Sequence, residues 1–128
     1  MLYPLVRFLA QYGQPLFTLH GFEITDSKNT TEGAEIYLKN AQVAVRLSQK
    51  KDQLPNLVFQ SLFEKGSRTW HPLHHISTLL KRPTNCASLD SANTAFFLTH
   101  TNSIVKLFSK ENTLQTLQKL KELKETQK

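Results

Sequence analysis

Cysteine and long apolar runs are scarce in this sequence. Its 128 residues include one cysteine, Cys86, so the chain can form no internal disulfide and does not match a disulfide-stapled secreted scaffold. A reducing compartment suits such a chain, and we predict a cytoplasmic location. No apolar run approaches the roughly 20 residues that span a bilayer, and Arg7 interrupts the apolar N-terminus, which has no signal-peptide cleavage site. We therefore expect no membrane partner.

The common catalytic motifs are also missing. The four glycines stand singly, so no Gly-rich phosphate loop is present, and no serine lies in a nucleophile-elbow pattern. The surroundings of Cys86, RPTNCASLD, match no nucleophile signature. Glu23 and Glu35 are close in sequence, but at strand positions that we expect to face solvent. We predict a protein that is not an enzyme and that has no cofactor.

Aromatic and aliphatic residues are plentiful. The hydrophobic fraction of 39%, with eight phenylalanines, three tyrosines and one tryptophan, excludes a disordered chain. A domain of this length buries roughly two-thirds of the surface that its unfolded chain exposes. We predict one domain over residues 1–128.

The first half of the chain changes from a helical to a strand period. Leu2, Leu5, Leu9 and Tyr12 recur at helical spacing before Gly13, which predicts a helix over 2–12, and a further helical turn is expected over 15–20. Apolar residues then alternate with polar ones. This alternation predicts strands starting at Phe22, over 34–39 and over 43–48, and NLVFQSLF reads as a fourth strand over 56–63.

The second half returns to the helical period. Pro72 suits the first position of a short helix ending before Pro83, and Ser88 suits the N-cap of a helix over 89–108. Ser109 is expected to cap the last helix. The predicted inward-facing residues of these two long helices are Phe97, Ile104, Leu107 and Phe108, then Leu114, Leu117, Leu120 and Leu123.

These elements predict an α+β fold. A four-stranded antiparallel meander sheet would have the N-terminal helix and three C-terminal helices packed on one face. The other face of the sheet then has no cover. That open face is a candidate binding surface, as are a sheet edge and the helical layer.

Three histidines stand close together in RTWHPLHH. If a helix begins at Pro72, His71 and His75 lie one turn apart on one face, with His74 beside them, a spacing that suits a transition metal. No nearby Cys, Asp or Glu offers a third or fourth ligand, and the zincin pattern requires a Glu directly after its first His. The competing interpretation is a polar helix start, and we predict no metal site.

Basic residues exceed acidic ones, and the excess lies in the second half. The net charge is +6, with six Lys or Arg against five Asp or Glu over 1–60 and ten against five over 61–128. This balance suits an acidic protein surface or nucleic acid, although scattered lysines on solvated helices give the same count. Trp70, between Arg68 and His71, suits an interface anchor or a core-capping tryptophan.

Four stretches, FLAQYGQPLF, VAVRLSQKKDQ, TWHPLHHISTLL and IVKLFSKENTLQTLQKLKEL, give the chain a layout that resembles a family of small bacterial α+β proteins of the toxin-immunity type. The family's central turn commonly carries Asp-Arg-Gly, where this chain has Lys51, Asp52 and Gln53. Proteins of that type accompany polymorphic and contact-dependent toxins and cover the toxin's active site. The resemblance implies a toxin domain as partner, with an acidic or mixed surface.

Three functions are therefore open. The first is an immunity protein that contacts its toxin through two groups of residues: Lys50 and Lys51, then Arg68, Trp70, His71, His74 and His75. The second is a sequence-indifferent nucleic-acid-binding module that uses the basic second half. The third is a His-dependent metalloenzyme, which requires a bound metal.

Overall fold

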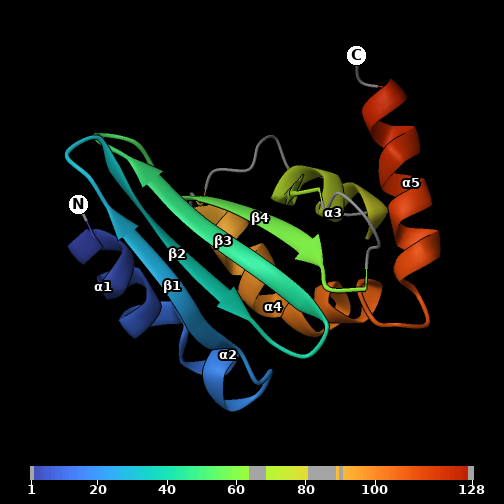
Figure 1. Cartoon of the computed structure of the whole chain (residues 1–128), viewed down its shortest axis with the longest axis horizontal. Coiled ribbons are helices and arrows are strands. Elements are labelled where there is room, and N and C mark those ends of the chain that lie inside the picture. Colours follow the sequence, from blue (N-terminus) through green and yellow to red (C-terminus); the bar gives the residue numbers. More distant parts are fainter. Residues whose placement is uncertain (1, 64–68, 81–88, 90, 127–128) are drawn as a thin grey trace.

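A five-stranded antiparallel sheet, covered on one face by helices, organises the computed structural model of this chain (Figure 1). The structure describes residues 2–63, 69–80, 89 and 91–126. The strands lie side by side in chain order: β1 (Glu23–Asn29), β2 (Gly33–Lys39), β3 (Val43–Lys50), β4 (Asn56–Ser61) and β5 (His71–Pro72). The helices are α1 (Leu2–Tyr12), α2 (Gln14–Thr18), α3 (Leu73–Leu79), α4 (Ser91–Leu107) and α5 (Thr113–Thr126). The α+β class and the antiparallel meander are confirmed.

Alternating side chains divide the sheet into two faces. In β2, β3 and β4 every second residue is buried, and these residues face the helices. The buried set is Ala34, Ile36, Leu38, Val43, Val45, Leu47, Leu57, Phe59 and Ser61. The residues between them point to the opposite side, which we call the open face, and on these three strands most of them are half-buried.

One apolar core joins the sheet to the helices. Leu5 and Leu9 of α1 and Phe97 and Ile104 of α4 are all buried within it. Phe59 of β4 packs against the rings of Phe97 and Phe108, with centroid distances of 6.0 and 6.3 Å. Burial of large aromatic side chains of this kind contributes most of the energy of a small core. The sheet therefore has a fixed inner face.

The fifth strand and the second helix correct the predicted count of four strands and four helices. β5 pairs with β4 through two residues, which are too few to produce a visible alternation. Pro72 donates no backbone hydrogen bond, a loss that an edge strand tolerates. It is also extended, with φ −72° and ψ 155°, so α3 begins at Leu73 and Pro72 does not open the helix. α2 is a five-residue helix at the expected helical turn.

The inner side of α5 differs from the predicted leucine stripe. Leu114 is 83% exposed, whereas Thr113 and Thr116 are buried together with Leu120. The threonine hydroxyls are satisfied, because Thr113 donates to the carbonyl of Ser109 (2.7 Å) and Thr116 donates to the carbonyl of Leu107. Threonine hydroxyl groups with backbone partners can therefore face the core, while Leu114 is exposed to solvent.

The N-terminal end of α5 is also fixed to the sheet. The Thr113 hydroxyl lies 3.0 Å from the hydroxyl of Ser61 in β4, and both side chains are buried. Ser109 contributes its carbonyl, which accepts the Thr113 N–H. The predicted N-cap of α4, Ser88, falls outside the described residues.

Replacing Thr113 by valine should destabilise the fold. Thr113→Val keeps the shape of the side chain but removes the hydroxyl that bonds Ser61 and the backbone, so we expect a loss of about 1–3 kcal/mol in the free energy of unfolding. Urea denaturation measures this loss. Thr99→Val, at an exposed position on α4, is the matched control and should change stability by less than about 0.5 kcal/mol. Equal losses in both variants would contradict the structural role of the Ser61–Thr113 contact.

Candidate functional site

Two aromatic rings and an arginine meet on the open face. Arg46 lies opposite Tyr37 in the pairing of β3 with β2, so both side chains emerge on the same side of the sheet. Trp70 directly precedes β5, and its ring lies 5.0 Å from the Arg46 guanidinium carbon and 6.3 Å from the Tyr37 ring. We call Tyr37, Arg46 and Trp70 the open-face cluster.

The cluster is held in place by stacking and by neighbouring charges. A guanidinium at this distance from an indole ring makes a cation–π contact, which orients both groups. The Lys28 ammonium lies 5.6 Å from the Tyr37 ring on its other flank. The Tyr37 hydroxyl donates a hydrogen bond to the Glu35 carboxylate, and this bond, with burial and the Glu35 charge, raises the pKa of Tyr37. Tyr37 therefore stays neutral and pointed along the sheet.

One nitrogen of Arg46 still has hydrogen-bonding capacity. Its Nε is buried and has no hydrogen-bond partner among the residues that the structure describes. Nearly all buried polar groups in proteins are paired, so an unpaired donor of this kind is costly in a free surface. A bound acceptor would remove that cost.

A shallow hollow of about 400 Å³ adjoins Arg46 at the end of the sheet where β3 turns into β4. Its charged lining residues are Lys28, Glu32, Glu35, Arg46 and Lys50. Three cations and two carboxylates thus surround a hollow with further hydrogen-bonding groups, including Ser48 and Asn56. Such a mixture suits a partner surface that is acidic or mixed in charge.

The predicted contact residues fall in different places. Lys50 lines the hollow, and Trp70 belongs to the open-face cluster. Arg46 belongs to both, so it joins the two groups of residues that were predicted as separate contact regions. Lys51 is exposed in the turn that follows β3. Arg68 falls outside the described residues. Tyr37 and Arg46 were not chosen as site residues, although the strand alternation already placed them opposite the apolar face.

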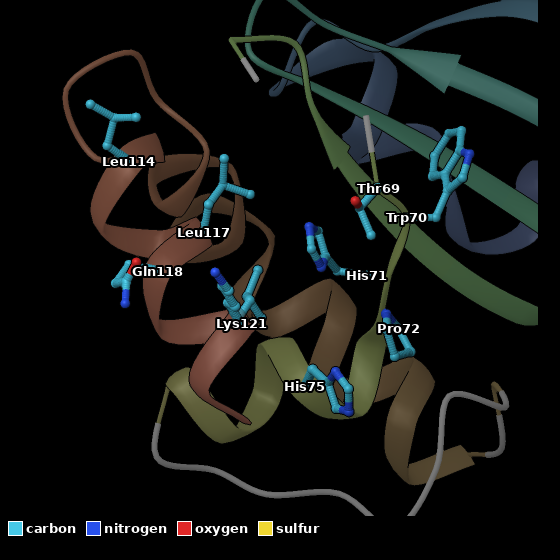
Figure 2. Close-up of a pocket in the computed structure, with 10 residues that line it drawn as sticks. Thr69, Trp70, His71, Pro72, His75, Leu114, Leu117, Gln118 and Lys121 are labelled. Carbon is cyan, nitrogen blue, oxygen red and sulfur yellow. The ribbon is translucent and has the colours of Figure 1, made fainter. Parts of the chain in front are cut away.

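The three histidines lie on the other side of β5. Figure 2 shows His71 and Trp70 pointing to opposite sides of the strand, and the His71 ring stacks 6.5 Å from Phe108. His74 and His75 belong to α3, where their rings meet edge to face at 4.4 Å. No group of three or more His, Cys, Asp or Glu that could hold a metal occurs within the described ranges. The helical spacing expected for His71 and His75 is wrong, because His71 is in a strand.

The comparisons with known proteins add no relative: no family model, no curated protein and no solved structure matches this chain. None of the helices among the described residues is both long and apolar enough to span a membrane.

Removing Arg46 should expose Trp70. Because Trp70 is the one tryptophan of the chain, its fluorescence reports this cluster alone. In Arg46→Ala the indole loses the guanidinium that lies over it, so we expect a red-shifted emission and stronger quenching by acrylamide. The control Lys28→Ala, which removes the cation over Tyr37, should leave both values near wild type. Unchanged quenching in Arg46→Ala would contradict the stacked geometry.

His74 should make stability depend on pH. Burial, and secondarily the positive charge of His75, lower the pKa of His74, and its Nδ1 is buried without a hydrogen-bond partner in the described structure. The unfolded state therefore binds the proton more readily. The stabilising contribution is complete above about pH 6.5 and is lost as the pH falls through the lowered pKa.

Urea denaturation of wild type and His74→Gln at pH 7.5 and pH 5 tests this dependence. Every other titrating group is shared, so the difference between the two proteins isolates His74. We expect the wild type to lose more stability than the variant on acidification. An equal loss of stability in both proteins would contradict the assignment of this pH dependence to His74.

Proposed function

We propose that this chain is a non-catalytic bacterial binding protein that neutralises a toxin domain by covering its active site, with the open face as its contact surface. The observation that supports the proposal most directly is the open-face cluster. Tryptophan, tyrosine and arginine are the residue types enriched at energetic centres of protein interfaces. Here one of each gathers at a single point on a sheet face that no described helix covers.

Order in the cluster also favours binding. Association usually costs the free energy of immobilising flexible side chains at the interface. In this chain the Trp70 ring is already stacked with Arg46, and Tyr37 is already bonded to Glu35. The cluster can therefore meet a rigid partner surface with little further loss of entropy.

The charge around the cluster favours a partner of acidic or mixed character. Lys28, Arg46 and Lys50 border the hollow beside the cluster, and the whole chain carries a net charge of +6. Opposite charge on the partner would accelerate association, and a carboxylate at the interface would supply the acceptor that Arg46 Nε lacks. Glu32 and Glu35 in the same hollow would in turn bind a basic group.

Nucleic-acid binding is a second candidate because aromatic rings and cations on an open sheet also stack unpaired bases. The two carboxylates beside the cluster count against this candidate, since they would repel a phosphate backbone. Of the basic second half, Lys119 and Lys121 lie on α5, a helix away from the open face.

Co-expression with the toxin domain encoded by the neighbouring gene tests the proposal. The wild-type chain should restore growth and bind the toxin domain in a 1:1 complex. Trp70→Ala and Arg46→Lys should each weaken binding at least about tenfold, because the first removes the anchor and the second keeps the charge but loses the planar stack. Lys110→Ala, at an exposed position between α4 and α5, is the control and should bind as wild type.

Two results would count against the immunity function. Growth inhibition that persists with the wild-type chain would exclude protection against that toxin. Binding of single-stranded DNA or RNA that weakens steeply with salt and is lost in Trp70→Ala would support the nucleic-acid candidate instead.

A further inference from the structure

A pocket of about 610 Å³ lies between α5 and the start of α3, on the opposite side of β5 from Trp70 (Figure 2). One wall is α5, which contributes Leu114, Leu117, Leu120 and Lys121. The other wall is the stretch from Thr69 to Pro72, with His75 of α3 at its base. We call this space the α5 pocket. Its volume falls in the range of sites that hold small organic ligands.

The walls of the α5 pocket are apolar where they meet α5 and β5. Leu120 is buried at its inner edge, Leu117 is partly exposed to it, and Pro72 closes the other side. Leu114 at the rim is 83% exposed, which is unusual for a leucine next to a concave surface. A ligand with an apolar body would remove these side chains from water, which is favourable by about 25 cal/mol for each Å² buried.

The ionisable groups of the α5 pocket are all of the basic type. Among the described lining residues they are His71, His75 and Lys121, with Gln118 and Thr69 as neutral polar groups. Figure 2 shows the His71 ring turned from β5 toward α5, the helix that carries Lys121. An anionic group placed between them would find an ammonium and an imidazole within one site.

We infer that the α5 pocket binds a small apolar molecule that carries a carboxylate, with the apolar body against Leu114 and Leu117 and the carboxylate near Lys121 and His71. A neutral apolar molecule would leave the ammonium without a counter-charge. A cationic one would be repelled by Lys121. This ligand site goes beyond the proposed toxin binding. Of the open-face cluster only Trp70 also lines the pocket, and its side chain is turned away from α5 (Figure 2).

Binding of decanoate to the purified full chain tests the inference. Isothermal titration calorimetry at low salt should give a saturable 1:1 complex, and decanol and decylamine should bind at least about tenfold more weakly, because they lack the negative charge. Decanoate should also displace the fluorescent probe 8-anilinonaphthalene-1-sulfonate, which has an apolar body and an anionic group.

Variants of the α5 wall distinguish binding in this pocket from nonspecific hydrophobic binding. Lys121→Gln should weaken decanoate binding at least about fivefold, and Leu117→Gln should weaken it by a similar factor through the apolar wall. Lys119→Gln is the matched control, because Lys119 is on the same helix but lines a different hollow, toward α4. Lys121 is exposed, so its replacement should leave the unfolding transition unchanged.

Three results would overturn the inference: no saturable binding of decanoate, equal binding of decanoate and decylamine, or equal weakening by Lys119→Gln and Lys121→Gln. The toxin test is independent of all three. Lys121→Gln should still protect against the toxin, and Arg46→Lys, at a position that does not line the α5 pocket, should still bind decanoate. Each proposal can therefore fail without the other.

Discussion

The packing of Phe59 against Phe97 and Phe108 decides which side of the sheet faces the helices. These ring contacts hold Phe59 of β4 against Phe97 of α4 and against Phe108, which directly follows α4. Because side chains alternate along a strand, an inward Phe59 turns its neighbours in β4 outward, and the pairing of β4 with β3 and of β3 with β2 does the same for Arg46 and Tyr37. A slip of one residue would exchange the two faces and bury the arginine.

Much of this arrangement follows from periodicity alone. The alternation over 34–39 and 43–48 predicts both the buried face and the outward direction of the remaining residues, and the bounds of α1 follow from its leucines and Gly13. The leucine spacing predicted the wrong inner face for α5, because that face includes Thr113 and Thr116 and leaves Leu114 exposed. Their hydroxyl groups can be buried because they donate hydrogen bonds to backbone carbonyls, and a hydrophobicity pattern does not show those partners.

The candidate site was only partly predictable for a related reason. Residue type was enough to select Trp70, since a lone tryptophan beside charged residues is a common interface anchor. Its contact with Arg46 and Tyr37 depends instead on the pairing of β4 with β5, a strand of two residues. The register of so short a strand is set by tertiary packing, including the contact of His71 with Phe108.

The shortness of β5 also explains why two different surfaces adjoin one another. Trp70 and His71 are consecutive, so strand geometry sends one side chain to the open face and the other toward α5. On the open face the rings and cations already contact each other, which suits a broad, rigid partner. On the other side the leucines of α5 line an open pocket, so a small ligand can fill it without moving the cluster. Of the open-face cluster only Trp70 also lines the pocket, and its side chain is turned away from α5. A macromolecule on the open face therefore leaves the pocket accessible.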